Sequence, residues 1–333
     1  MLFDLAFLWA AIIAFGIIMY VILDGFDLGI GILSLLTKSE DDRDLMISTI
    51  MPVWDGNETW LVFGGAALYG AFPRAFSELL PAAYLPIFIM VLALLFRGVA
   101  FEFRLKATWS KKIWDYAFFG GSLIAILMQG ELLAMLIQGF KMTADGHVVA
   151  NVSWLNPFGI FCGIALVIGY TLLAADWLII KTVGDLQKFC YKVASYAQYL
   201  LAVCAIIVSV WTPLISPEIF DKWFDLNKIP YLAIFPAVTM FAVWQHYTAI
   251  NNKNEYKPFR YAIIVFIMCY LGLAYSCYPY IVPRTITYMD AAAEDQSLRF
   301  LSYGALFMLP ALLYYTYYSY KVFRGKVTQK LEY

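Results

Sequence analysis

Seven ionisable side chains lie within or beside long apolar stretches of this 333-residue sequence, and their chemistry needs an explanation. A charged group among hydrocarbon costs several kcal/mol unless it is paired, hydrated or turned toward the interior of a helix bundle. Carboxylates and an arginine in such surroundings form ion pairs or pass protons along a hydrated path. The seven residues are Asp24, Asp27, Asp55, Glu58, Arg97, Glu131 and Asp176.

Asp24 and Asp27 are three residues apart, so they share one face of a helix. Gly25 and Gly29 form a GxxxG step beside them, and such a step lets a second helix approach closely. We predict that this face is a contact between helices.

Asp27, Asp55 and Arg97 all fall in the half of the membrane nearer the cytoplasm, given the chain orientation derived below. Three such groups at one depth have two interpretations. They form a buried ion-pair network that only fixes helix packing, or they line a hydrated inlet in which a carboxylate beside Arg97 relays protons. We favour the inlet and include the neighbouring Asp24 and Glu58 in the predicted proton pathway.

The remaining two carboxylates, Glu131 and Asp176, lie in other predicted spans. Glu131 lies mid-membrane beside Gln129 and Gly130, so a hydrogen bond to a neighbouring helix and a proton-relay role both stay open. Asp176 sits toward the cytoplasmic end of its span. For Asp176 we expect snorkelling or helix capping, which is a structural role.

Ligands for redox metals are scarce. Haem iron is usually held by His, Cys or Met, and the chain has only His147, in a predicted outer loop, and His246, expected to be a hydrogen-bonded helix-interface residue. The five cysteines include no CxxC pair and are interpreted as packing residues, neither disulfides nor metal ligands. A multi-haem protein built from this chain alone is therefore disfavoured.

The elements that position these groups follow from composition. Hydrophobic residues make up 62% of the chain and charged residues 14%, which is typical of a protein whose solvent is lipid. Runs such as 200–210 do not alternate apolar and polar residues, so helices are favoured over a β-barrel. The first span lacks signal-peptide features and is expected to stay in the mature protein.

A bilayer core of about 30 Å needs roughly 20 apolar residues per helix. We predict an all-α polytopic membrane protein of about nine spans, forming a single integral membrane domain over residues 1–333. The predicted spans are 5–35, 57–79, 82–103, 114–140, 158–180, 197–216, 229–250, 260–283 and 299–323.

Orientation follows from the positive charges in alternate loops, because the cytoplasmic side retains Lys and Arg. One set of loops holds sixteen of them and the other set six, with Arg97 inside a helix. This asymmetry predicts an outer N-terminus and a cytoplasmic C-terminus, which requires an odd number of spans. The aromatic-rich helix ends are typical of interfacial belts, and no basic face suggests nucleic acid.

Several motifs closely resemble subunit II of cytochrome bd quinol oxidases, most specifically over residues 20–120. Beyond residue 190 the resemblance rests on the helix count, Tyr278-Pro279 and the tail. The motifs are DGFDLGIG at 24–31, PVWDGNETWL at 52–61, GGAAL at 64–68, FRGVAFEFR at 96–104, Trp114-Asp115 and KTVGDL at 181–186.

The resemblance implies two four-helix bundles plus one peripheral helix, packed against a subunit I that carries haems b558, b595 and d and the quinol site. Such oxidases oxidise quinol at the outer side of the bacterial inner membrane and reduce oxygen to water with cytoplasmic protons. They build a proton gradient without pumping. Asp27, Asp55 and Arg97 match positions associated with the proton path in that family.

The same resemblance is compatible with a small single-helix subunit in the complex and with a structural quinone or lipid bound to this chain. Phe96-Arg97-Gly98 replaces the Arg-Pro of some members, and the C-terminal half differs from the longer ubiquinol-type forms, which suggests a cyanide-insensitive branch. An ion-coupled secondary transporter is the alternative from another class, although the sequence has no internal repeat. A haem-free scaffold without a proton path is a third interpretation.

Overall fold

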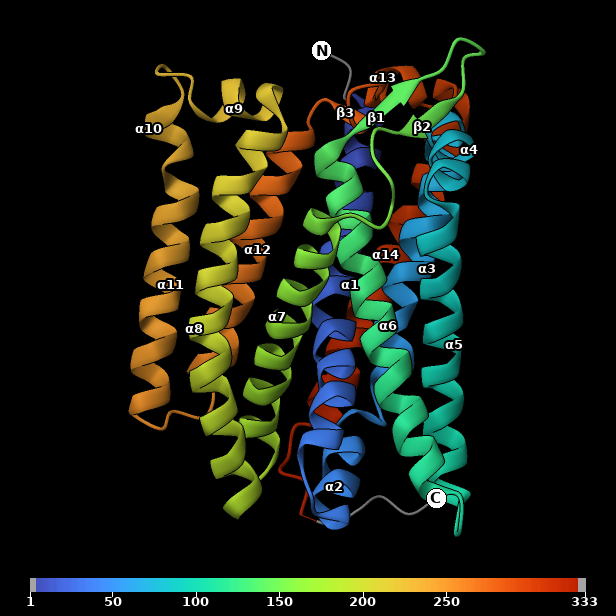
Figure 1. Cartoon of the computed structure of the whole chain (residues 1–333). Helices are drawn as coiled ribbons and strands as arrows, with labels where there is room; N and C mark the ends of the chain where they lie inside the picture. The colour runs from blue at the N-terminus through green and yellow to red at the C-terminus, as the bar shows by residue number, and fades with distance from the viewer. Residues whose placement is uncertain (1–3, 329–333) are drawn as a thin grey trace.

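The computed structural model describes residues 4–328, and within them the chain is a helical bundle with short strands at one end (Figure 1). In lipid a helix satisfies its own backbone hydrogen bonds, which explains the predominance of helix. The all-α prediction is confirmed. The helices are α1 Leu5–Leu36, α2 Glu40–Ile50, α3 Trp54–Ala71, α4 Pro73–Ala82, α5 Tyr84–Lys106, α6 Lys111–Gln138, α7 Pro157–Lys181, α8 Gly184–Ile215, α9 Pro217–Trp223, α10 Ile229–Leu232, α11 Ile234–Asn251, α12 Lys257–Cys277, α13 Tyr288–Ala291 and α14 Asp295–Val322.

Seven helices of the described chain are long and apolar enough to cross a membrane, namely α1, α5, α6, α7, α8, α12 and α14. The predicted spans 57–79 and 229–250 fall on α3 and α11, which have 18 residues each and carry several polar side chains. The first of these spans is interrupted at Phe72, because α4 starts with Pro73, which suits the first turn of a new helix. The count of nine therefore stays a prediction.

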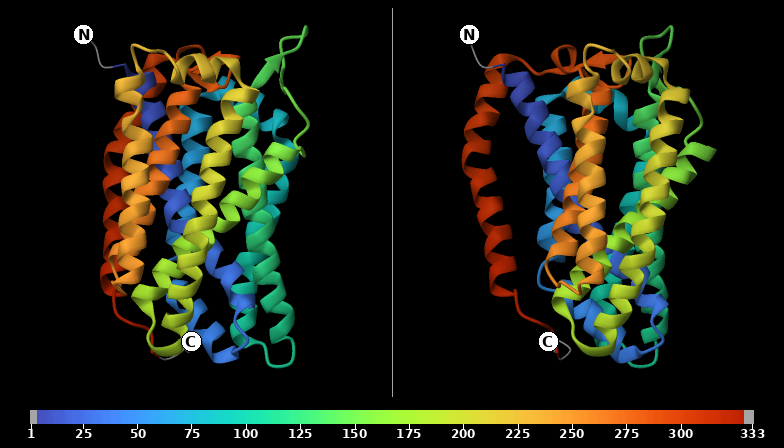
Figure 2. Two further views of the ribbon diagram at one scale, coloured as in Figure 1. Left: turned by 60° about the vertical axis from the view of Figure 1, so that its left-hand side comes forward. Right: turned by 90° about the vertical axis from the view of Figure 1, so that its left-hand side faces the viewer.

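The long helices form two groups of four with one helix at the edge. One group is α1, α3, α5 and α6, and the other is α7, α8, α11 and α12 (Figure 1). α7 joins the two groups because it packs against α1, α6, α8 and α12. In the described part of the chain, α14 packs mainly against α3 and α1 among the long helices, and it stands at the margin of the bundle in Figure 2. This arrangement confirms the expected two bundles and peripheral helix.

α1 and α7 approach closely at the GxxxG step. A Cβ atom added at Gly29 would lie 2.0 Å from the backbone carbonyl oxygen of Tyr170 on α7, and one at Gly25 would lie 2.8 Å from the Tyr170 ring. Only a residue without a side chain fits at Gly29. The predicted helix contact is confirmed, and it brings the carboxylates of α1 into the middle of the protein.

The two ends of the bundle differ. The hairpin end holds two antiparallel strand pairs, β1 Phe140–Met142 with β2 Val148–Ala150 and β3 Tyr280–Val282 with β4 Ile286–Thr287. The other end, called the α2 end here, holds α2, a helix that follows the N-cap Ser39 and was not predicted from the sequence. The start of α1 and the end of α14 lie at opposite ends (Figure 1).

Candidate functional site

Arg97 on α5 is fully buried and holds two carboxylates from two other helices. Its Nη1 donates to Asp24 Oδ1 of α1 at 2.6 Å, and its Nη2 donates to Glu58 Oε2 of α3 at 3.2 Å. The Asp24 side chain is also fully buried, whereas that of Glu58 is 26% exposed. One positive charge therefore faces two acidic groups, one of which reaches the surface of the chain.

Asp27 belongs to the same region but does not contact Arg97. Asn57 Nδ2 donates to Asp27 Oδ2 at 2.7 Å, and the Tyr320 hydroxyl of α14 donates to Asn57 Oδ1 at 2.8 Å. Asp27 is fully buried, and its Oδ1 has no hydrogen-bond partner among residues 4–328. A buried polar atom without a partner is suited to a water molecule or to a proton on the carboxyl group.

A second arm of hydrogen bonds runs from α7 through α6 to Tyr20, one turn before Asp24 on α1. The Tyr170 hydroxyl donates to Gln129 Oε1, and Gln129 Nε2 donates to the Tyr20 hydroxyl oxygen, both at 2.8 Å. Tyr20 lies one turn before Asp24 on α1 and interacts with its carboxylate. Because Tyr20 accepts from Gln129, its own hydrogen is free to point toward Asp24.

Local sequence explains how α3 supplies its share of the site. The helix begins at Trp54, so Asp55, Asn57 and Glu58 fall in its first two turns, where the helix dipole favours negative charge. Asn57 is buried and Glu58 turns toward Arg97, but Asp55 is exposed. We refer to Asp24, Asp27, Asn57, Glu58, Arg97 and Tyr320 as the Arg97 network.

The predicted trio of Asp27, Asp55 and Arg97 thus lies in one region, but no hydrogen bond or ion pair joins its members to one another within the described residues. Arg97 pairs with Asp24 and Glu58, Asp27 is reached through Asn57, and Asp55 faces outward. The expectation was based on depth in the membrane, and depth leaves the direction around the helix axis undetermined. Sequence reasoning also missed Asn57 and Tyr320, because neutral polar residues at helix ends are common in membrane proteins.

A second ionic cluster at the α2 end was missed entirely. Its charges were counted as loop charges, yet Arg104 and Asp115 are 2% and 3% exposed. Arg104 Nε donates to Asp115 Oδ1 at 2.5 Å, and Arg43 Nη1 donates to Asp115 Oδ2 at 2.7 Å. Arg104 also pairs with Asp44 at 2.7 Å, and Lys111 with Asp44 at 3.1 Å. The dense mixture of acidic and basic residues in 40–44 is the signal that was available.

The two clusters share α5. Arg97 and Arg104 are seven residues apart, about 10.5 Å along a helix at 1.5 Å per residue and almost two full turns. They therefore lie on similar sides of α5. Outside the membrane, burial tends to raise the pKa of Asp44, but hydrogen bonds from Arg104 and Lys111 outweigh it and hold that pKa below its ordinary value.

Asp176 corrects another expectation. It neither snorkels nor caps a helix, because its side chain is fully buried and its Oδ2 lies 2.8 Å from His246 Nε2 of α11. His246 Nδ1 is hydrogen-bonded to Gln198 of α8. The expectation failed because the partner is 70 residues away along the chain. His246 is confirmed as a hydrogen-bonded interface residue.

Glu131 is 2% exposed, and its Oε2 has no hydrogen-bond partner among the described residues. It packs against Gly159 of α7, where an added Cβ would lie 1.8 Å from that oxygen. The structure thus places the Glu131 side chain between α6 and α7, outside the Arg97 network.

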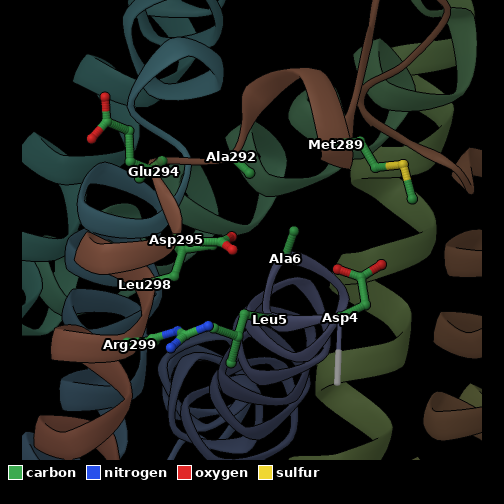
Figure 3. A pocket seen from close by; sticks show the side chains of 10 residues that line it. Asp4, Leu5, Ala6, Met289, Ala292, Glu294, Asp295, Leu298 and Arg299 are labelled. Carbon is green, nitrogen blue, oxygen red and sulfur yellow. The ribbon is translucent and has the colours of Figure 1, made fainter. Parts of the chain in front are cut away.

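A cavity of about 610 Å³ lies at the hairpin end, between the first turn of α1 and the start of α14. Figure 3 shows Asp295 and Arg299 of α14 beside Leu5 and Ala6 of α1. Asp4 at its wall precedes Asp24 by twenty residues, which is about 30 Å of helix. The cavity is therefore separated from the Arg97 network by the thickness of a membrane core.

Neither histidine of the described chain is placed to bind a metal or a haem. Both ring nitrogens of His246 are engaged, and the His147 side chain is 77% exposed in a loop. Within residues 4–328 no group of three or more His, Cys, Asp or Glu is arranged to hold a metal ion. What the site offers is a set of acid–base groups held by hydrogen bonds.

The chain is similar over almost its whole length to known proteins of one kind. The chain is 30% identical to the cytochrome bd ubiquinol oxidase subunit 2 of Bacillus subtilis (strain 168), with 97% of each protein covered. It is 26% identical to the cytochrome bd-I ubiquinol oxidase subunit 2 of Escherichia coli (strain K12), covering 98% of this chain and 96% of that protein. In fold it matches a chain of the bd oxidase from Geobacillus thermodenitrificans with a TM-score of 0.81, at 16% identity and with 96% and 98% of the two chains covered.

The fold and the site define a multi-pass helical membrane protein with a buried network of acid–base groups. The family model of cytochrome bd terminal oxidase subunit II matches residues 5–323. The chain belongs to this family, and the resemblance stated from its motifs is confirmed. It is a multi-pass bacterial membrane protein whose homologues are subunits of an oxidoreductase.

Proposed function

We propose that this chain is the haem-free second subunit of a quinol:oxygen oxidoreductase of the aerobic respiratory chain. In this proposal it supports a haem-bearing subunit I and provides a cytoplasmic proton path for the reduction of oxygen to water. The observation that carries the proposal is Arg97, fully buried yet bonded to Asp24 and Glu58, beside an Asp27 oxygen that has no partner among the described residues.

The haems b558, b595 and d and the quinol site belong to the partner subunit, and there they supply the electron-transfer chemistry. This chain's own residues hold and move protons. Reduction of oxygen to water consumes protons, so the complex needs a path to the reacting centre. A carboxylate is suited to this task when opposing influences keep both of its protonation states accessible.

The geometry suggests an order for the proton path. Glu58 is the partly exposed member and receives the proton, while Asp24 and Asp27 are the buried members that pass it inward. The Arg97 charge prevents the acidic groups from repelling one another and keeps Asp24 in place. Asp55, exposed on the chain alone and one turn before Glu58, belongs to the inlet that the partner subunit covers.

The α2 end faces the cytoplasm in this proposal, with the N-terminus outside and the C-terminus inside. The excess of Lys and Arg in the loops at that end supports this orientation. A structural quinone or lipid, or a small single-helix subunit, is proposed to bind the apolar outer face of α14, where Phe300, Leu306 and Phe307 are exposed.

The test is substitution within the purified complex. Asp27→Asn and Asp24→Asn are expected to slow quinol-driven oxygen reduction while the haem absorption spectrum of the complex stays unchanged. Asp145→Asn, in an exposed loop at the hairpin end, is the matched control. If turnover is unchanged across pH in both Asp27→Asn and Asp24→Asn, the chain is a scaffold without a proton path. Solute uptake by the isolated chain in liposomes would instead favour the transporter alternative.

A further inference from the structure

The C-terminal tail and the end of α7 cap each other. Lys181, the last residue of α7, donates to the backbone carbonyl oxygen of Phe323 at the end of α14. In return, Lys326 of the tail donates to the carbonyl oxygens of Ile179 at 3.2 Å and Thr182 at 3.0 Å. These carbonyls are the ones a helix leaves without partners at its C-terminus, where a positive charge is also favoured.

Lys326 is held from a second side. Its Nζ lies 2.9 Å from Glu255 Oε2 in the loop between α11 and α12, and Gln187 Nε2 of α8 donates to Glu255 Oε1 at 2.8 Å. Gln187 also donates to the carbonyl oxygen of Ile179. Lys326 therefore connects the end of α7 to the loop between α11 and α12, and Gln187 of α8 joins the same group through Glu255 and Ile179. We call this group, Lys181, Gln187, Glu255 and Lys326, the tail clasp.

The clasp matters because the most buried part of α14 lies far from the tail. Its buried residues are Leu298 and Ala305, both in the half near the hairpin end. Figure 2 shows the helix standing at the margin of the bundle over its length. In the half near the tail, Leu312 packs against the core and the Tyr315 ring lies beside Gly56 of α3. Tyr320 adds contacts with the rings of Phe26 and Trp177 and a hydrogen bond from its hydroxyl to Asn57.

Tyr320 connects this end of α14 to the Arg97 network. Its hydroxyl donates to Asn57 Oδ1, which leaves the Asn57 amide hydrogens to donate to Asp27 Oδ2. Asn57 Nδ2 also donates to the carbonyl oxygen of Leu23 at 3.3 Å, so an outward movement of α14 would remove one of the contacts that fix the orientation of this amide. The charged groups that act on Asp27 besides this contact are Asp24, Glu58 and Arg97.

We propose that Lys326 is a positioning residue for proton transfer: by clasping the tail to α7 and Glu255, it holds Tyr320 on Asn57 and so holds the Asp27 carboxylate in its relay geometry. This inference rests on the proposed function. It assigns a role at the site to a charged residue that lies four residues beyond the end of α14 and touches none of the network.

The experiment compares Lys326→Gln, Lys326→Arg and Tyr320→Phe in the purified complex. Lys326→Gln is expected to speed amide hydrogen exchange in residues 314–328 about tenfold, since hydrogen bonds from a charged donor are lost. It is also expected to shift the pH profile of oxygen reduction in the same direction as Tyr320→Phe. The double variant is expected to shift the pH profile no further than Tyr320→Phe alone. Lys326→Arg is expected to keep both the hydrogen exchange and the pH profile of the unsubstituted complex.

Arg324→Gln is the control, because Arg324 is exposed in the same tail and makes no ion pair with the described residues. Faster exchange with an unchanged pH profile would overturn the inference and leave the proposed function intact, provided that Asp27→Asn still slows turnover. Unchanged exchange in Lys326→Gln would overturn it as well. If Asp27→Asn and Tyr320→Phe are both without effect, the proposed function itself fails.

Discussion

Arg97 Nη1 and Asp24 Oδ1 lie 2.6 Å apart, and both side chains are completely removed from solvent. Removing one partner of a buried ion pair leaves an uncompensated charge, which usually costs more than the pair contributed. The pair therefore supports the fold of the first bundle as well as any proton transfer. This double role separates the consequences of substituting Arg97 from those of substituting Asp27.

Arg97→Leu is expected to destabilise the complex by about 3–5 kcal/mol, because Asp24 stays buried without its partner. The measurement is the thermal unfolding of the purified complex in detergent. Arg74→Leu, on an exposed face of α4, is the matched control and is expected to change stability by about 0.5 kcal/mol or less. Equal stability of the two variants would show that Arg97 does not hold the helices together.

Gly29→Ala is expected to destabilise the contact between α1 and α7. The new methyl group would lie 2.0 Å from the Tyr170 carbonyl oxygen, and a backbone atom cannot move aside cheaply. Overpacking of this kind costs about 1–3 kcal/mol. Gly120→Ala on α6, where no atom lies within 4 Å of an added Cβ, is expected to be neutral or slightly stabilising. Denaturation midpoints of the two variants test the difference.

The ionic cluster at the α2 end is expected to make stability depend on acidity. Hydrogen bonds from Arg104 and Lys111 hold the pKa of Asp44 below its ordinary value despite its burial. A carboxylate with a lowered folded pKa stabilises the protein above its unfolded pKa, and this contribution is lost as the pH falls through the folded value. The melting temperature should therefore drop below about pH 4.

Asp44→Asn is expected to lower the melting temperature at neutral pH and to flatten this acid dependence. Asp41→Asn, on the exposed side of the same short helix, should leave the dependence unchanged. If the melting temperature of Asp44→Asn still falls at acid pH as in the unsubstituted protein, other carboxylates cause this dependence.

His246→Leu is expected to destabilise the second bundle without shifting the pH profile of oxygen reduction. The substitution leaves Asp176 buried with no partner, at a cost of about 1–3 kcal/mol or more. Within residues 4–328 no hydrogen bond or ion pair joins Asp176 to the Arg97 network. His147→Leu in the exposed loop is the control. A shifted pH profile in His246→Leu at unchanged stability would mean that the Asp176 pair takes part in proton transfer.

Much of the fold is predictable from local sequence. The long apolar runs located α1, α5, α7 and most of α6 to within a few residues, because the thickness of the bilayer sets the length of a span. The boundaries of α3 and α8 were less accurate. α3 ends at Ala71 before a proline, and α8 begins at Gly184 with polar turns that lie outside an apolar window.

By itself, the sequence determined the solvent of this protein, its helical class, its family and the small set of charged residues that require partners, since hydropathy and motifs are local properties. The choice of partners was decided by the tertiary structure alone. Depth along a helix follows from residue number, but the direction of a side chain and its neighbours follow from packing. For this reason Arg97 forms ion pairs with Asp24 and Glu58, while Asp55 stays exposed. For the same reason Asp176 bonds to His246, which is 70 residues further along the chain.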